Sequence, residues 1–210
     1  MVKIYITTMS ETIFDGAEER LSEYRRAKAR RRKNGAEAKA AGLLLDYALR
    51  EYGLYERDME YGENEHGKPF FKNRTDIKFS ISHSGEYAVC AVSDREIGVD
   101  AEECGDTKNA LKIAEHYFTE REYEYVKNSG DTKIAFFRLW TRKESLLKAI
   151  GTGISGGLSA YEVLDDEIAV RDTKFCFSEI GGYENAIITV CAQERVTSVE
   201  FVTAKMFKSI

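Results

Sequence analysis

The sequence predicts an α+β fold built from two similar halves, and three observations indicate it. First, KFSISHSGEY at 78–87 and KFCFSEIGGY at 174–183 match at five positions in the same register. Second, each copy is followed by an apolar segment typical of a strand, AVCAV at 88–92 or AIITVCA at 186–192. Third, each copy follows a long segment with the pattern of a helix. We therefore expect a duplicated unit that combines strands with one long helix.

The individual elements follow from local patterns. Alternating and β-branched residues predict strands at 2–7, 78–84, 87–93 and 96–102, the last after the turn SDRE. The long helices are expected over roughly 17–50 and 132–150, the second ended by Gly151 and Gly153. Another helix should begin at Thr119, where T-E-R-E offers a capping box with Glu122. The division between the halves is placed near residue 95, which gives units of 1–95 and 96–210.

Composition is that of an ordinary globular protein, with 210 residues, 43% of them apolar and 32% charged. No apolar run reaches the roughly 18 residues that span a bilayer, and the first residues lack a signal-peptide pattern. We expect a cytoplasmic protein without a membrane partner. The cysteines show no C-x-x-C spacing, so we expect small buried side chains in a reducing compartment rather than zinc ligands or disulfides. They are Cys90, Cys104, Cys176 and Cys191.

Positive charge is concentrated in one segment although the net charge is −5. RRAKARRRK at 25–33 has seven basic residues among nine. This segment is either a solvated helix face or a site for a phosphate-bearing small molecule, an acidic partner protein or nucleic acid. A nucleic-acid-binding domain is usually basic overall, so we do not expect nucleic acid as a partner.

Two glycine motifs are better interpreted as a helix end. GTGISG at 151–156 matches the dinucleotide fingerprint G-x-G-x-x-G, and GISGG at 153–157 matches the hydrolase motif G-x-S-x-G. Both motifs require a preceding strand, whereas these residues follow a predicted helix.

Ser82, His83 and Ser84 do not predict a serine hydrolase, because adjacent residues of a strand point to opposite faces. His83 would share a face with Phe79 and Ile81. It is either a satisfied core histidine or a donor to a phosphate beside a lysine, and the second interpretation fits better.

Three carboxylates give the clearest indication of a chemical site in the sequence. Asp100 and Glu102 share one face of the strand at 96–102 with Gly98, either as a solvated edge pair or as ligands of a cation. Mg²⁺ takes carboxylate oxygens together with water and substrate phosphate. Glu144 lies on the apolar face of the helix at 132–150 and would be a third ligand if that helix packs over the strand; alternatively, it caps a helix with Thr141.

Lysines complete the predicted site. Lys148 lies one helical turn after Glu144 and would contact a metal-bound phosphate, with Lys68 also neutralising phosphoryl charge. Lys143 faces another side of the helix, where we expect a solvated charge.

Four segments together resemble the Sfp-type 4′-phosphopantetheinyl transferases, in the order and spacing of that family. They are GKP at 67–69, FSISHSG at 79–85, IGVDAE at 97–102 and WTRKESLLKAIG at 140–151. The resemblance implies a pseudo-twofold fold in which each half packs a small antiparallel sheet with a long helix. It also implies Mg²⁺-dependent transfer of the phosphopantetheine arm from coenzyme A to a serine of an acyl or peptidyl carrier protein. The other product would be adenosine 3′,5′-bisphosphate.

The resemblance further implies roles for individual residues. The metal ligands would be Asp100, Glu102 and Glu144, and Glu144 would also be the base that takes the serine proton. Lys148 would act on the coenzyme A phosphates. The nucleotide end would be held by Lys68, Ser82 and His83, with Lys39 in place of a family arginine. Lys28 would reach the nucleotide phosphate from the basic segment, with Arg25 and Arg26 as the alternatives.

Two alternatives remain at this point. One is a noncatalytic module of the same fold that binds coenzyme A or an acidic carrier protein. The other is a Mg²⁺-dependent nuclease that uses Asp100 and Glu102, although it would lack the lysine expected two residues after the second carboxylate. The resemblance favours the transferase and predicts a monomer that is an internal pseudo-dimer.

Overall fold

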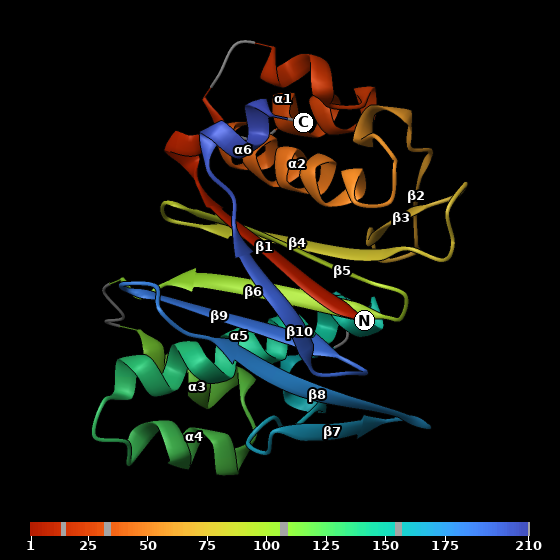
Figure 1. Ribbon diagram of the computed structural model, residues 1–210. Coiled ribbons are helices and arrows are strands. Elements are labelled where there is room, and N and C mark those ends of the chain that lie inside the picture. Colours follow the sequence, from red (N-terminus) through yellow and green to blue (C-terminus); the bar gives the residue numbers. More distant parts are fainter. Residues whose placement is uncertain (14–15, 32–34, 106–108, 154–156, 210) are drawn as a thin grey trace.

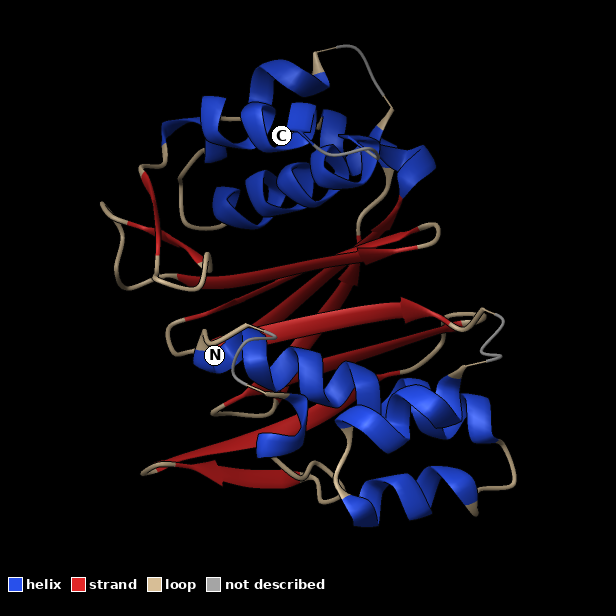
Figure 2. Cartoon of the chain, turned by 180° about the vertical axis from the view of Figure 1, so that it is seen from behind, coloured by secondary structure: helices blue, strands red, loops and turns tan. Residues whose placement is uncertain are grey.

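The computed structural model describes residues 1–13, 16–31, 35–105, 109–153 and 157–209. Two sheets lie face to face in the middle, and helices cover the outer face of each (Figures 1 and 2). This four-layer arrangement confirms the predicted α+β class with two similar halves.

The first sheet has the strand order β10-β1-β5-β4. Its strands are β10 (Val196–Phe201), β1 (Val2–Thr8), β5 (Tyr87–Ser93) and β4 (Lys78–Ser84). β5 pairs antiparallel with both β1 and β4, whereas β10 is parallel to β1. A small hairpin, β2 (Tyr61–Glu63) and β3 (Pro69–Phe71), extends beside it.

The outer helices of this half are α1 (Glu23–Arg31) and α2 (Gly35–Arg50). Leu43, Leu44 and Leu45 are buried, so α2 lies against the sheet through its leucine-rich centre. The prediction of one helix over 17–50 is wrong. The chain instead makes a 3-10 turn at Ala17–Arg20 and becomes extended at Leu21, with φ −95° and ψ 140°, before α1 begins. The extended backbone at the buried Leu21 ends the 3-10 turn. Helix α1 then forms separately and packs across α2.

The second sheet has the strand order β6-β9-β8-β7, and all its neighbours are antiparallel. Its strands are β6 (Ile97–Glu103), β9 (Ala186–Ala192), β8 (Thr173–Ile180) and β7 (Glu167–Val170). The helices are α3 (Ala110–Tyr117), α4 (Glu120–Lys127) and α5 (Thr132–Ile150). The capping box of Thr119 with Glu122 is confirmed, as is the end of α5 at Gly151, whose φ is 76°.

The repeat seen in the sequence is a repeat of structure. Strands β1, β5 and β4 occur in the same order as β6, β9 and β8. Tyr87 and Tyr183 occupy the same position in the two copies, and their rings meet edge to face with centroids 5.4 Å apart. The division near residue 95 stays a prediction. The last elements, β10 and α6 (Ala204–Lys208), follow the second sheet in the chain but pack with the first, where Val202 and Phe207 join its core.

The interior between the sheets is formed by short and β-branched side chains. Ile4, Val89, Val99 and Val190 are among them, so the odd-numbered residues of β6 face the other sheet. All four cysteines are buried, as predicted. Within the described ranges, no helix is both long and apolar enough to cross a bilayer.

Helix α5 crosses β6 at unusually short range because Gly98 has no side chain. A Cβ atom at Gly98 would lie 1.9 Å from the Ser145 carbonyl oxygen and 2.5 Å from the Ala149 nitrogen. These are backbone atoms of α5, so they cannot rotate away. The even-numbered face of β6 therefore lies against the C-terminal half of α5, with backbone contact at Gly98.

Replacement of Gly98 by Ala should lower the free energy of unfolding by about 1–3 kcal/mol, because a methyl group must push α5 away from β6. Urea denaturation measures this. Gly130→Ala is the matched control, since a Cβ there meets nothing within 4 Å, and it should change stability by less than about 0.5 kcal/mol. Equal stability of the two variants would contradict the close packing of α5 on β6.

Candidate active site between the two halves

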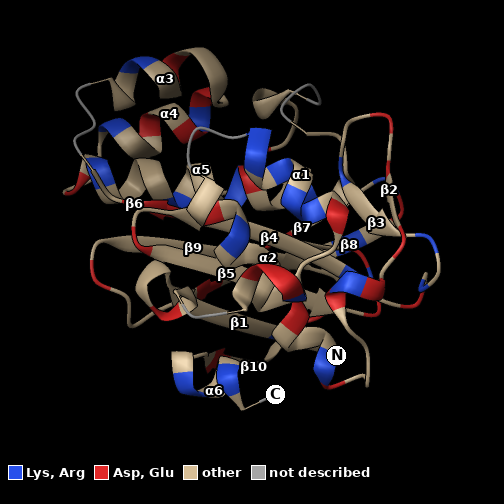
Figure 3. Cartoon of the chain, turned by 90° about the horizontal axis from the view of Figure 1, so that it is seen from above, with Lys and Arg blue, Asp and Glu red and all other residues tan. Residues whose placement is uncertain are grey.

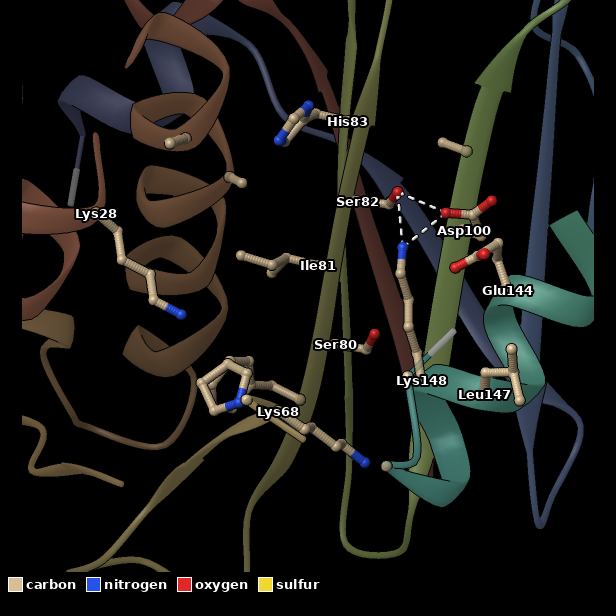
Figure 4. A pocket seen from close by; sticks show the side chains of 18 of the residues that line it. Lys28, Lys68, Ser80, Ile81, Ser82, His83, Asp100, Glu144, Leu147 and Lys148 are labelled. Atoms are coloured by element: carbon tan, nitrogen blue, oxygen red, sulfur yellow. Dashed lines mark hydrogen bonds and ion pairs between the residues drawn. The ribbon is translucent and has the colours of Figure 1, made fainter. Parts of the chain in front are cut away.

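A cavity of about 450 Å³ lies where the first half meets the second. Residues from α1, α2, β4, β6, α5 and the loop before β3 line it. Eight of the residues predicted from the sequence are among them: Lys28, Lys68, Ser82, His83, Asp100, Glu102, Glu144 and Lys148. Figure 4 shows most of these side chains converging on the space between β4, α1 and α5.

Strands β4 and β6 meet at the edges of their sheets through serine side chains. Ser80 Oγ accepts a hydrogen bond from the Val99 backbone nitrogen at 3.0 Å, and Ser84 Oγ accepts one from that of Glu103 at 2.9 Å. Between them, Ser82 Oγ donates to Asp100 Oδ1 at 2.9 Å. Every second residue of β4 therefore faces β6, which leaves His83 on the opposite face as the alternation predicts.

Lys148 reaches from α5 into this junction. Its Nζ donates to Asp100 Oδ1 at 2.6 Å, to Ser82 Oγ at 3.0 Å and to the Val99 carbonyl oxygen at 3.0 Å (Figure 4). Asp100 is only 4% exposed. The ammonium thus neutralises a buried carboxylate between the two halves.

The other two carboxylates lie nearby in a poorly solvated environment. Burial raises the pKa of Glu144, and the neighbouring Asp100 charge raises it further. Burial followed by the Asp100 charge also raises the pKa of Glu102, whose side chain accepts a hydrogen bond from Ser84 at 3.2 Å. Asp100 Oδ2 and Glu144 Oε1 are buried and have no hydrogen-bond partner within the described part of the chain.

The unpartnered oxygens of Asp100 and Glu144 show whether the side chains present suit a metal ion. Unpartnered buried carboxylate oxygens fit a hard divalent cation, which takes oxygen ligands and offsets their repulsion. Among the residues that the structure describes, however, no three His, Cys, Asp or Glu side chains are arranged to hold a metal ion as they stand. In this arrangement the described residues could therefore offer a metal ion fewer than three such protein ligands, and water or substrate oxygens would complete its coordination.

Comparison with known proteins identifies the family. Residues 96–191 match the family model described as the 4′-phosphopantetheinyl transferase superfamily. A 4′-phosphopantetheinyl transferase of Bacillus subtilis is 34% identical over 172 residues, which cover 77% of this chain and 76% of that protein. The chain belongs to this family. It is therefore a transferase, and its fold of two similar halves agrees with that assignment.

Other similar proteins are also 4′-phosphopantetheinyl transferases. The 4′-phosphopantetheinyl transferase Sfp of Bacillus subtilis strain 168 is 32% identical over 172 residues, again 77% of this chain and 76% of the relative. The transferase gsp of Aneurinibacillus migulanus is 39% identical over 114 residues, or 53% of this chain and 46% of its own length. The family resemblance drawn from the four sequence segments is thus confirmed.

The basic segment of this transferase is not one uniform surface, although α1 is rich in Lys and Arg (Figure 3). Arg25 is 4% exposed and lies over the rings of Tyr61 and Phe79, with its carbon Cζ 5.1 and 5.5 Å from their centroids. Its Nη2 is buried without a partner among the described residues, and the side chain lines the cavity. A solvated face is therefore the wrong interpretation for Arg25. Residues 32 and 33 of the segment lie outside the described residues.

Neighbouring cations border the same cavity. Lys28 lies 2.8 Å from Glu63, and Lys68 donates to Glu96 at 2.7 Å and to the Ala149 carbonyl oxygen at 2.9 Å. His83 Nδ1 lies 3.2 Å from a carboxylate oxygen of Glu37. Lys28, Lys68 and His83, which the sequence assigned to the nucleotide, thus line the same cavity.

Lys39 lies elsewhere. It lines a second cavity on another side of α2 and pairs with Glu18, whereas Ala38 and Ala41 are the α2 residues that line the first cavity. One residue along a helix turns a side chain by about 100°. The structure therefore does not bring Lys39 together with the other predicted site residues.

Lys143 differs most from expectation, because it is 1% exposed rather than solvated. Its Nζ lies 2.7 Å from Glu122 and donates to the Leu158 and Tyr161 carbonyl oxygens, each at 2.7 Å. Burial lowers the pKa of Lys143, opposed by Glu122. The capping residue Glu122 was recognised in the sequence, but nothing there indicated that α4 would bury it against α5.

Two alternatives drawn from the sequence can now be decided. Thr141 bonds to the Arg138 carbonyl oxygen and to Thr189, and α5 begins nine residues earlier at Thr132, so Glu144 caps no helix. The glycine motifs begin after α5 rather than after a strand, although their residues 154–156 lie outside the described part of the chain.

Proposed function

We propose that this protein transfers the 4′-phosphopantetheine arm of coenzyme A to a serine hydroxyl of an acyl or peptidyl carrier protein, with Mg²⁺, and releases adenosine 3′,5′-bisphosphate. Family membership supports the transferase class. The decisive observation is one cavity in which three carboxylates and Lys148 lie beside a row of cationic side chains. Phosphoryl transfer needs such neutralisation of charge at the reacting phosphate.

Coenzyme A would lie with its anionic nucleotide end toward the first half. Arg25, Lys28, Lys68 and His83 line that part of the cavity, and Nη2 of Arg25 is buried with a free donor. Hydrogen bonds from ionised donors to phosphate are stronger than neutral ones, which supports this orientation. The diphosphate would then lie between these residues and Lys148, beside Ser82.

Asp100, Glu102 and Glu144 would hold the Mg²⁺ ion. The ion would supply charge neutralisation at the diphosphate. Support comes from the unpartnered oxygens of Asp100 and Glu144 and from the oxygen-only donor set.

Glu144 and Lys148 would act on the reacting groups. In the transfer, a bond forms between the carrier serine oxygen and the β-phosphorus, and the bond from that phosphorus to the bridging oxygen breaks. Glu144, with a buried oxygen that lacks a protein donor, is placed to accept the serine proton, directly or through water. Lys148 would stabilise the negative charge on the leaving phosphate.

Incubation of the protein with an apo carrier protein, coenzyme A and Mg²⁺ tests the proposal. Mass spectrometry should find the carrier heavier by one phosphopantetheine group, with one adenosine 3′,5′-bisphosphate formed for each carrier modified. A chelator should stop the reaction. Binding of the carrier without any gain in mass, across a panel of acyl and peptidyl carriers, would instead favour a noncatalytic binding module.

Coenzyme A affinity tests the cationic side of the cavity separately. Lys28→Met and His83→Ala should each weaken binding by roughly 1–3 kcal/mol, which is the value of one charge-assisted hydrogen bond. Calorimetric titration measures the change. Lys39→Met is the matched control, because Lys39 belongs to another cavity, and it should bind coenzyme A as the unmodified protein does. If only Lys39→Met lost affinity, the nucleotide would occupy that second cavity.

A further inference from the structure

The three N–H donors of Lys148 all have acceptors within the protein. They are Asp100 Oδ1 at 2.6 Å, Ser82 Oγ at 3.0 Å and the Val99 carbonyl oxygen at 3.0 Å. An ammonium group has no fourth donor. In this arrangement Lys148 has no donor left for a phosphate, so its proposed role at the diphosphate requires that it first leave Asp100.

Asp100 offers a second cation only Oδ2, which is buried without a partner among the described residues. Its carboxylate is 4% exposed, and Oδ1 already accepts from both Lys148 and Ser82. A divalent ion bound to the same carboxylate would lie within a few ångströms of the ammonium, and like charges at that range in a poorly solvated site repel strongly. The two cations therefore compete for Asp100, and binding of the divalent ion favours release of the ammonium.

We propose that Lys148 is the resident counter-ion of Asp100, held by Ser82 and the Val99 carbonyl, and that a divalent cation displaces it on binding. Ser82 is then a positioning residue that acts through Lys148 and lowers the affinity for the metal. This inference rests on the proposed role of Asp100 as a metal ligand.

The displacement links metal binding to coenzyme binding. Once released, the ammonium has three free donors at the side of the cavity where the diphosphate is proposed to lie. The metal therefore creates the phosphate-binding form of Lys148, and the coupling is reciprocal, so coenzyme A should strengthen metal binding in turn.

Binding of Mn²⁺, measured by the electron paramagnetic resonance of the free ion without coenzyme A, tests the competition directly. Lys148→Met should bind Mn²⁺ at least roughly tenfold more tightly than the unmodified protein, because the ion no longer breaks a charged hydrogen bond. Ser82→Ala should bind it about two- to tenfold more tightly, since one bond to the ammonium is lost. Ser80→Ala is the matched control on the same strand, because its hydroxyl bonds to the Val99 nitrogen and not to Lys148, and its Mn²⁺ affinity should not change.

Nuclear magnetic resonance of the lysine ammonium groups separates displacement from a simple effect of charge. Without added metal, Lys148 should give a signal protected from exchange with water, and saturating Mg²⁺ should abolish that protection. Lys143 is the internal control on the same helix, because neither it nor its buried partner Glu122 lines the cavity, and its signal should stay protected throughout.

Each outcome decides a specific point. Equal Mn²⁺ affinity of Lys148→Met and the unmodified protein, or a Lys148 signal that stays protected with Mg²⁺, would overturn the displacement while the metal site stood. Failure of every form to bind Mn²⁺, or binding by Asp100→Ala equal to that of the unmodified protein, would overturn the metal site as well. Ser82→Ala keeps both charges, so it remains informative if Lys148→Met does not fold.

Discussion

Replacement of Glu144 by Gln should lower turnover by a factor on the order of a hundred or more, with a smaller change in coenzyme A affinity. A base or metal ligand acts mainly on the transition state, so its loss appears in the rate rather than in ground-state binding. Glutamine has nearly the same shape, so the packing of α5 on β6 should persist. Single-turnover rates and calorimetric titration of the same preparations measure the two effects.

The alternative outcome is equally clear. A Glu144→Gln variant within about threefold of the unmodified rate at saturating Mg²⁺ would remove Glu144 from the chemistry. His83→Ala provides the contrast, because a coenzyme-binding residue should lose affinity while keeping its rate at saturation. If His83→Ala bound coenzyme A normally but did not turn over, His83 would be the catalytic group instead.

Replacement of Lys143 by Met should lower the free energy of unfolding by about 3–5 kcal/mol, because it leaves Glu122 buried without its cation. Glu122 is 0% exposed and cannot regain water without unfolding of α4 from α5. Two carbonyl oxygens, those of Leu158 and Tyr161, also lose their donor. Urea denaturation measures the loss.

A second variant isolates the cause. In Lys143→Met combined with Glu122→Gln, the uncompensated charge is gone, so part of the lost stability should return. The recovery should be incomplete, because Glu122 also caps α4 and accepts a hydrogen bond from the Val163 nitrogen. A loss below about 1 kcal/mol in the single variant would show that this ion pair is not needed for stability.

The sequence by itself determined which side chains share a face. Alternation along 96–102 placed Asp100 and Glu102 together, and alternation along 78–84 separated His83 from Ser82. Helical spacing set Lys148 one turn after Glu144, and the repeated segment predicted two similar halves. These features depend on periods of 2.0 and 3.6 residues, which any local stretch of sequence displays.

Only the tertiary structure decided what each face meets. The contact of α5 with Gly98 places Lys148 on Asp100, and the covering of α5 by α4 turns Lys143 from a surface charge into half of a buried pair. Tertiary packing also decided that Arg25 lines the first cavity and that Lys39 lines a different one. A charged residue has the same local pattern whether it ends in water or against a partner distant in the chain, because burial and pairing depend on contacts between segments that periodicity does not specify.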